Sequence, residues 1–271
     1  MECRFIDTGP NDACLNMAID ESLLELCSAP ILRVYSWLTP SISAGYNQKV
    51  SKEINIAKCR EENVPIVRRI TGGKAILHDN EMTYSFILPE ASLNLPDSIT
   101  ESYKVIARAL VVSLRKVGIM AAINRQPDRV STPMCFNSSN WYELSVGSKK
   151  ICGSAQRRIN GKILQHGSLL IDFDYERNAA LFNSDSSSNS YTPYELRGKI
   201  TSIKNELSRE VSYEELANAL KYGFQENFRL RLIESKLTPD ETKLAEKLKR
   251  DKYEKDSWNF REEAAECTTL L

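Results

Sequence analysis

The strongest restriction on the fold is a strand-like segment followed directly by an amphipathic one. Met82–Leu88 is rich in β-branched and aromatic residues, and Pro89 stops it, which favours a strand. Ser98 and Glu101 then form a capping pattern ahead of apolar residues at helical spacing, which continue until Gly118. Each such element must bury one face against another element. The sequence therefore predicts a mixed α/β core.

Other segments add to this pattern. A turn at 9–12 precedes helical spacing that runs to Leu24. We expect a hairpin-like pair from 30–37 and 41–46, a strand from 66–69, a second hairpin from 141–146 and 150–151, and a strand within 162–173. The serine-rich run 184–190 is too polar to pack, so it predicts a surface loop or flap.

Two capped helices are expected after this loop, one after Ser212 and one after Thr238. We therefore divide the chain into a catalytic core, residues 1–210, and a helical carboxyl-terminal tail, residues 211–271, packed on that core. The expected architecture is a mixed β-sheet core flanked by helices.

The balance of charge excludes one class of function. Lys and Arg together number 36, as do Asp and Glu, so the chain lacks the basic surface by which proteins bind nucleic acid. No window approaches the roughly 18 apolar residues of a membrane span, and the segment after Met1 lacks the pattern of a signal peptide. We expect a cytoplasmic protein with neither nucleic acid nor a membrane as partner.

The seven cysteines are irregularly spaced and form no Cys-x-x-Cys pair. This pattern indicates neither zinc nor disulfides, and we expect no metal site. In a reducing compartment most of these cysteines should be small buried hydrophobic residues. The question is whether one of them has the surroundings of a reactive thiol.

Glycines and cations are concentrated between Arg68 and Asp79. Paired glycines at 72 and 73 let the backbone approach a ligand, and nearby Arg and Lys supply positive charge. The segment suits an acyl or phosphate cradle, although a tight turn with solvated basic residues would have the same composition. The only histidines, His78 and His166, both lie near glycines. We favour a positioning role over general-base catalysis for both, because no pattern places either beside a nucleophile.

Two cysteines compete for the role of nucleophile. A thiolate suits acyl transfer from a thioester to an amine, and a neighbouring lysine ammonium favours the thiolate. If 150–152 is extended, Lys150 and Cys152 share a face, which favours Cys152. Cys135 instead lies in a Ser- and Asn-rich loop of the kind that carries function. Both could also be core cysteines.

Five segments resemble the biotin/lipoate A/B protein ligase superfamily and span most of the expected core. They are Asn16-Met17-Ala18-x-Asp20-Glu21, Arg68-Arg69-x-Thr71-Gly72-Gly73 with His78-Asp79, Cys135-Phe136 with Trp141-Tyr142-Glu143-Leu144, Lys150-x-x-Gly153-Ser154-Ala155-Gln156, and Gln165-His166-Gly167-Ser168. The Cys-Phe pair ahead of Trp-Tyr-Glu-Leu is similar to the cysteine-dependent octanoyl-[acyl carrier protein]:protein octanoyltransferases of Gram-positive type.

The resemblance implies the biotinyl/lipoyl ligase-transferase fold and a set of site residues. Cys135 would form an acyl thioester, and Lys150 would lower the pKa of its thiol. Cys152 is then a departure from the family, which usually has a smaller residue there, and would be a packing thiol. The implied substrate-binding residues line an acyl tunnel; they are Arg68, Arg69, Thr71, Gly72, Gly73, His78, Asp79, Gly153, Ser154, Ala155, Gln156, His166 and Gly167.

The resemblance implies octanoyl transfer from acyl carrier protein to the lysine of a lipoyl domain, such as the glycine-cleavage H protein, without a cofactor. The alternative is a lipoate-protein ligase, which forms an acyl-adenylate and would need ATP and Mg; it could be bipartite. A non-catalytic acyl-binding or carrier-binding module is a third reading. The pairing of Cys135 with Lys150 argues against the third, because binding alone requires neither residue.

Overall fold

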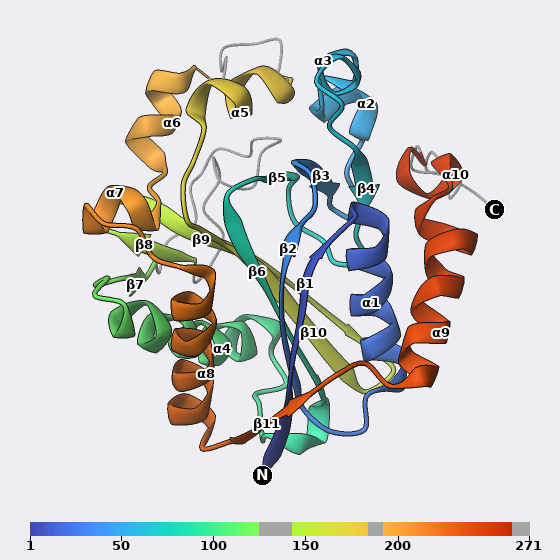
Figure 1. Cartoon of the computed structure of the whole chain (residues 1–271), viewed down its shortest axis with the longest axis vertical. Helices are drawn as coiled ribbons and strands as arrows, with labels where there is room; N and C mark the ends of the chain where they lie inside the picture. The colour runs from blue at the N-terminus through green and yellow to red at the C-terminus, as the bar shows by residue number, and fades with distance from the viewer. Residues whose placement is uncertain (125–142, 184–191, 262–271) are drawn as a thin grey trace, which may run out of the picture.

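The computed structural model describes residues 1–124, 143–183 and 192–261 (Figure 1). Its main feature is a mixed sheet of eight strands among these residues. In spatial order the strands are β11 (Arg231–Ser235), β1 (Glu2–Asn11), β2 (Ile31–Trp37), β6 (Glu81–Pro89), β10 (Lys162–Leu170), β9 (Lys149–Ile159), β8 (Leu144–Val146) and β7 (Ala122–Ile123). A smaller sheet has the order β4 (Ile66–Arg68), β3 (Ser41–Ala44) and β5 (Ile76–His78).

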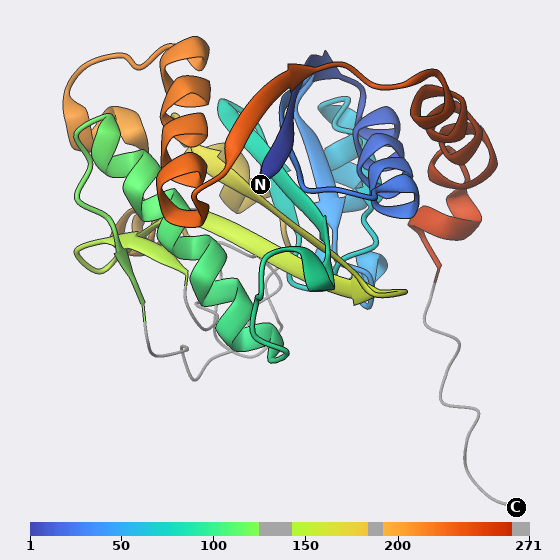
Figure 2. The same ribbon diagram turned by 90° about the horizontal axis from the view of Figure 1, so that it is seen from below.

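Helices cover both faces of the large sheet (Figure 2). Helices α4 (Ile99–Lys116) and α8 (Tyr213–Phe228) pack together on one face. On the other face lie α1 (Ala13–Leu26), the small sheet and, outside α1, α9 (Pro239–Leu248). The shorter helical elements are α2 (Val50–Glu53), α3 (Ile56–Glu61), η1 (Glu90–Ser92), α5 (Tyr175–Leu181), α6 (Pro193–Lys199), α7 (Ile203–Leu207), η3 (Lys249–Tyr253) and α10 (Asp256–Asn259).

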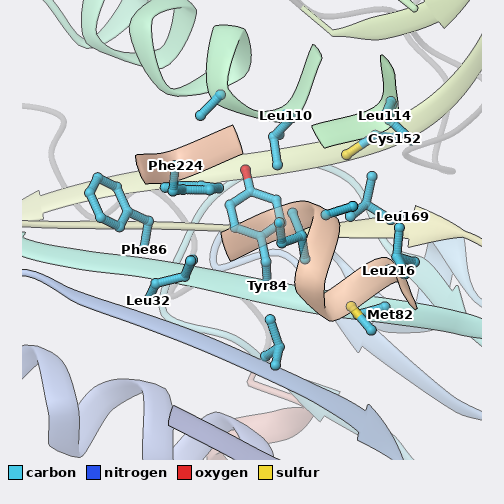
Figure 3. Close-up of a cluster of buried hydrophobic side chains, with 14 of the residues drawn as sticks. Leu32, Met82, Tyr84, Phe86, Leu110, Leu114, Cys152, Leu169, Leu216 and Phe224 are labelled. Atoms are coloured by element: carbon cyan, nitrogen blue, oxygen red, sulfur yellow. The ribbon is translucent and has the colours of Figure 1, made fainter. Parts of the chain in front are cut away.

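The two faces of the sheet belong to separate apolar clusters. Leu110 of α4 and Phe224 of α8 meet Tyr84 and Phe86 of β6 in one cluster (Figure 3). The cluster on the other face joins α1 to the sheet and to residues of the carboxyl-terminal segment. The mixed β-sheet core flanked by helices is therefore confirmed.

The helix ends follow the capping patterns in the sequence. Ser98, Ser212 and Thr238 each accept a hydrogen bond from the backbone amide three residues on, at the starts of α4, α8 and α9. Thr238 and Glu241 form a complete capping box. These short-range signals therefore predict where α4, α8 and α9 begin.

The expected hairpin from 30–37 and 41–46 is wrong. Both strands exist, but β2 lies between β1 and β6 in the large sheet, whereas β3 lies between β4 and β5 in the small one. Alternating apolar residues predict a strand but do not identify its partner. The carboxyl-terminal tail is also not purely helical, because β11 pairs in parallel with β1 and extends the large sheet.

The hairpin of β8 and β9 is present, but it contains a bulge. Leu144 pairs with Cys152 and Ser145 pairs with Lys150, so Ile151 has no residue opposite it. Ile151 and Cys152 both join the same apolar cluster. The regular alternation that would place Lys150 and Cys152 on one face therefore does not hold here.

Within the described residues, no helix is both long enough and apolar enough to cross a membrane.

Candidate active site

A pocket of about 350 Å³ lies between the large and small sheets. Its wall combines the adjacent strands β9 and β10 with residues from α1, β2, β3, β5 and β6. The lining residues are Met17, Tyr35, Ser43, Arg69, Ile76, His78, Thr83, Gly153, Ser154, Ala155, His166, Gly167 and Ser168. Glycine at 167 is required, because a Cβ there would lie 2.3 Å from Oγ of Ser154. The lining suits a slender, largely apolar ligand.

Arg69 shapes the glycine loop at the edge of this pocket. Its guanidinium donates to Oγ1 of Thr71 at 3.1 Å and to the backbone carbonyls of Gly72 and Lys74 at 2.7 and 2.8 Å. Gly45 packs against the same loop so closely that a Cβ would lie 1.9 Å from the carbonyl oxygen of Gly73. Most of the hydrogen-bond donors of Arg69 therefore bind the glycine loop.

A buried ionic network supports the pocket from below. Asp20 accepts from Nη1 of Arg33 at 2.6 Å and from the hydroxyls of Tyr35 and Ser85 at 2.9 and 2.7 Å. Asp20 and Arg33 are both almost fully buried, with exposed side-chain fractions of 1% and 0%. Burial alone would raise the pKa of Asp20, but Arg33, His166 and Ser85 outweigh it and lower the pKa to about 2. Asp20 is therefore ionised at neutral pH.

The network reaches the glycine loop through His166. Nδ1 of His166 lies 2.9 Å from Asp20, and Nε2 lies 2.7 Å from Oγ1 of Thr71. Because ionised Asp20 can only accept, a proton sits on Nδ1 of His166, and Nε2 shares the second hydrogen bond with Thr71. His166 thereby fixes Thr71, which fits the expected positioning role.

His78 forms another part of the pocket wall. Its ring stacks on Trp37 with centroids 3.9 Å apart, and Nε2 lies 2.8 Å from Oγ of Ser43. Burial lowers the pKa of His78, more than Glu81 at 3.4 Å raises it, so the ring is neutral at pH 7. His78 therefore offers a flat, uncharged surface to the pocket.

Lys150 lies at the start of β9, the strand that continues into the pocket wall. Its ammonium is buried and lies 2.6 Å from the carboxylate of Glu143. A buried ammonium needs such a counter-charge. Cys135, the expected nucleophile, lies outside the described residues.

Cys152 lies in the apolar cluster under α4, near Leu114 (Figure 3). Its side chain is 1% exposed, and its sulfur lies 3.8 Å from Oγ of Ser154. Thiols buried in apolar surroundings are usually inert. These surroundings suit the packing role implied by the family resemblance.

The structure gathers most of the expected binding residues at the pocket, but not all. Arg69, His78, Gly153, Ser154, Ala155, His166 and Gly167 line it, and Thr71, Gly72 and Gly73 form the adjoining loop. Asp79 faces away and pairs with Arg177 at 3.0 Å. Gln156 contacts Ser102 and Gln165 instead.

Arg68 also lies outside the pocket lining and connects distant segments. Its guanidinium donates to the carbonyls of Gly45, Tyr46 and Gln48 on one side. On the other side it donates to three carbonyls in the carboxyl-terminal segment, those of residues 258, 259 and 261. Arg68 therefore joins this segment to the turn that packs against the glycine loop.

The motifs do not assign a role to three buried charged residues near the site. Two of them, Asp20 and Glu143, lie within motifs, and the third, Arg33, lies in none. The sequence does contain a signal, since Asp20 interrupts an apolar helix face and Arg33 an apolar strand. A buried charge usually has a partner, so these two interruptions indicate an ion pair.

The described residues contain no group of three or more His, Cys, Asp or Glu side chains placed to hold a metal ion. The arrangement instead offers a pocket for an apolar chain, a glycine loop that can face a carbonyl group, and a buried lysine on β9, a strand that forms part of the pocket wall.

Comparisons with known proteins agree with this geometry. Residues 12–225 match the lipoyl protein ligase A/B catalytic domain family. The chain is 38% identical to the octanoyltransferase LipM of Brevibacillus brevis and 36% identical to that of Bacillus subtilis, covering 95% of this chain and 98% of each relative. A crystal structure of lipoate-protein ligase A bound with ATP is similar, with a TM-score of 0.82 and 26% identity over 97% of this chain and all of the other.

Proposed function

Because this chain belongs to the lipoyl protein ligase A/B catalytic domain family, we propose that it transfers octanoyl groups from acyl carrier protein to a lipoyl domain. It is an octanoyltransferase of protein lipoylation, and a lipoyl-domain protein is its acceptor. The observation that carries this assignment is the likeness to octanoyltransferases over 95% of the chain. The carrier-protein donor, an H protein as acceptor and the residue roles below are parts of the proposal.

The chemistry proceeds in two steps through Cys135. The Cys135 thiolate attacks the donor's thioester carbonyl, a new carbon–sulfur bond forms, and the carrier's thiol leaves as a thiolate that takes up a proton. The lysine amine of the lipoyl domain then attacks the enzyme thioester. The amide forms, the amine loses a proton, and Cys135 leaves as the thiolate. Neither step consumes ATP.

Lys150 would stabilise the thiolate form of Cys135. An ammonium near a thiol favours its anion, and the Glu143 carboxylate at 2.6 Å keeps that ammonium balanced in a buried place. Gly153, three residues after Lys150 on β9, lines the pocket. The same strand therefore carries both the activating ammonium and part of the acyl site. Backbone groups at Gly153 and Ser154, which line the pocket, would orient the acyl carbonyl.

The pocket would hold the octanoyl chain. Each buried methylene contributes about 0.8 kcal/mol, so the apolar wall discriminates chain length by a few-fold per carbon. His166 acts by fixing Thr71 and hence the loop, while neutral His78 packs along the chain.

A covalent intermediate tests the proposal. After incubation with octanoyl carrier protein and no ATP, intact-mass spectrometry should show one added octanoyl group that neutral hydroxylamine removes. Cys135→Ser should lose this adduct, because a serine hydroxyl is scarcely ionised at neutral pH. Cys152→Ala is the matched control and should keep both adduct and transfer, with a stability loss of about 1 kcal/mol. Adduct loss in Cys152→Ala but not in Cys135→Ser would contradict the assignment.

One observation favours a second candidate. The fold likeness to lipoate-protein ligase A bound with ATP, at a TM-score of 0.82, fits an ATP-dependent ligase, alone or as one part of a bipartite enzyme. That reaction needs ATP and Mg, and octanoate or lipoate as the acyl source. Product formation that depends strictly on ATP would establish the ligase and exclude direct transfer.

A further inference from the structure

A second hollow of about 900 Å³ adjoins the acyl pocket beyond the glycine loop. Its walls come from α1, the turn between β9 and β10, and the carboxyl-terminal segment, which carries Lys252 and Trp258. We call it the β9–β10 groove. It differs from the acyl pocket in being lined mainly by charged and aromatic side chains, among them Tyr46, Arg157 and Lys162.

Two arginines converge on Tyr46 of this groove: Arg157, which lines it, and Arg261, which lies beside its wall at Tyr46 and Trp258. The guanidinium carbons of Arg157 and Arg261 lie 4.8 and 3.8 Å from the ring centroid of Tyr46. Within the described part of the chain, neither arginine nor the nearby Lys162 has a carboxylate within 4.0 Å, whereas Lys252 is paired with Glu21 at 2.6 Å. Glu25 also lines the groove, but with Arg261 beside it the cations still outnumber the carboxylates.

Such a convergence of like charges favours an anion. Two guanidinium groups beside one aromatic ring repel each other, and guanidinium groups are the preferred partners of phosphate oxygens. Hydrogen bonding from Arg261, and then the charges of Arg261 and Arg157, lower the pKa of the Tyr46 phenol, which reports the same positive field.

The groove and the acyl pocket lie in succession along one face of β9. Alternate residues of a strand point to the same side. Gly153 and Ala155 line the acyl pocket, and the next residues in this series, Arg157 and Ile159, line the groove. Arg157 also donates to the backbone carbonyl of Ile70 at 2.6 Å, beside the glycine loop. One linear ligand could therefore occupy both sites.

We propose that the β9–β10 groove binds the phosphodiester of the donor's phosphopantetheine arm, with Arg157 and Arg261 as its ligands. This inference rests on the proposed function. The arm has roughly 13 bonds between phosphorus and thioester sulfur, which span ~16 Å when extended. Arg157 lies four residues from Gly153 and seven from Lys150, or ~13 and ~23 Å along the strand. The thioester would then lie between Gly153 and Lys150.

The polarity of the two sites favours the donor over the acceptor. The arm is a long chain with a phosphate at one end and an acyl thioester at the other, matching a cationic groove that continues into an acyl pocket. The acceptor presents a lysine on a folded domain, and that amine is itself cationic before reaction. A cationic groove would not attract it.

Three donors test the inference on the full-length chain: octanoyl carrier protein, octanoyl-4′-phosphopantetheine and octanoyl-pantetheine, which lacks the phosphate. The readout is KM for formation of the acyl-enzyme by intact mass. The KM of the wild type for octanoyl-pantetheine should exceed its KM for octanoyl-4′-phosphopantetheine by a ratio of at least about ten. Arg157→Gln with Arg261→Gln should reduce this ratio toward one and raise KM for the carrier protein. Arg115→Gln, which neutralises an exposed arginine on α4, is the matched control and should keep the wild-type ratio.

The outcomes separate this inference from the proposed function. A wild type that no donor acylates would refute the proposed function itself. A wild type that is acylated with a ratio near one, or a double variant that keeps the wild-type ratio, would refute the groove assignment alone. A raised KM for the lipoyl-domain acceptor with an unchanged donor ratio would also overturn it. The single variant Arg261→Gln keeps the hydrogen bond from Arg157 to the Ile70 carbonyl. If the double variant unfolds, the KM ratio of this single variant for the two small donors still tests the groove assignment.

Discussion

Removal of the charge on Asp20 should be among the most destabilising single changes in this chain. Asp20→Asn keeps the size of the side chain but leaves Arg33 buried without its counter-charge, at a place where the ion pair is 2.6 Å long and at most 1% exposed. Breaking a buried pair from one side costs about 3–5 kcal/mol. The amide nitrogen would also face a hydroxyl or ring donor, because Tyr35, Ser85 and His166 all direct donors at the same oxygen.

Urea unfolding followed by circular dichroism measures this cost. Glu215→Gln is the matched control, because it removes the carboxylate partner of Arg209 from a pair that is 40–47% exposed, where solvent screens the charges. Its free energy of unfolding should stay close to that of the wild type. Arg33→Met added to Asp20→Asn should recover part of the loss by removing the stranded charge. A cost below about 1 kcal/mol for Asp20→Asn, or no recovery in the double variant, would show that water or rearrangement satisfies Arg33 and that the reasoning is wrong.

Three further predictions concern the acid stability of Asp20, the packing at Gly223 and the thiol chemistry of Cys135. Folding lowers the pKa of Asp20 from 3.8 to about 2, so the ionised carboxylate contributes about 2 kcal/mol to the free energy of unfolding. This contribution is complete above about pH 4 and is lost as the pH falls through 2. In Asp20→Asn the free energy of unfolding should therefore depend less steeply on pH in this acid range. Gly223→Ala should cost about 1–3 kcal/mol, because a Cβ would lie 2.4 Å from a backbone carbonyl of α4, whereas Gly198→Ala on an open helix surface should be neutral or stabilising in thermal unfolding. Lys150→Ala should slow iodoacetamide alkylation of Cys135 at pH 7 with recovery at higher pH, and an unchanged profile would remove Lys150 from the mechanism.

Local signals predict the four longest helices, α1, α4, α8 and α9, but neither the shorter helices nor the strand partners. Ser98, Ser212 and Thr238 cap helices through contacts three residues away, so the sequence contains the whole signal. Strand pairing joins residues far apart, as in β11 with β1, and alternation within a strand cannot reveal it. The bulge at Ile151 is a similar case, because it depends on the register of two strands.

The candidate site likewise combines motifs that the sequence reveals with long-range contacts that it does not. The Thr71–Gly73 loop and the Gly153–Ala155 strand could be identified as motifs, since their chemistry lies within a few consecutive residues. The network of Asp20 with His166 could not, because it joins residues 146 positions apart. The two arginines of the β9–β10 groove are likewise brought together only by the fold.

The connection made by Arg68 has a consequence for the order of events during synthesis. Its guanidinium holds the turn at 45–48 and the segment at 258–261 together, and that turn supports the glycine loop. On the ribosome the turn emerges more than two hundred residues before its partner segment. Strands β1, β2, β6, β10 and β9 of the large sheet all emerge before that segment. The loop gains its full support only late in translation, so a nascent chain that already contains every binding motif would still have an unsupported site.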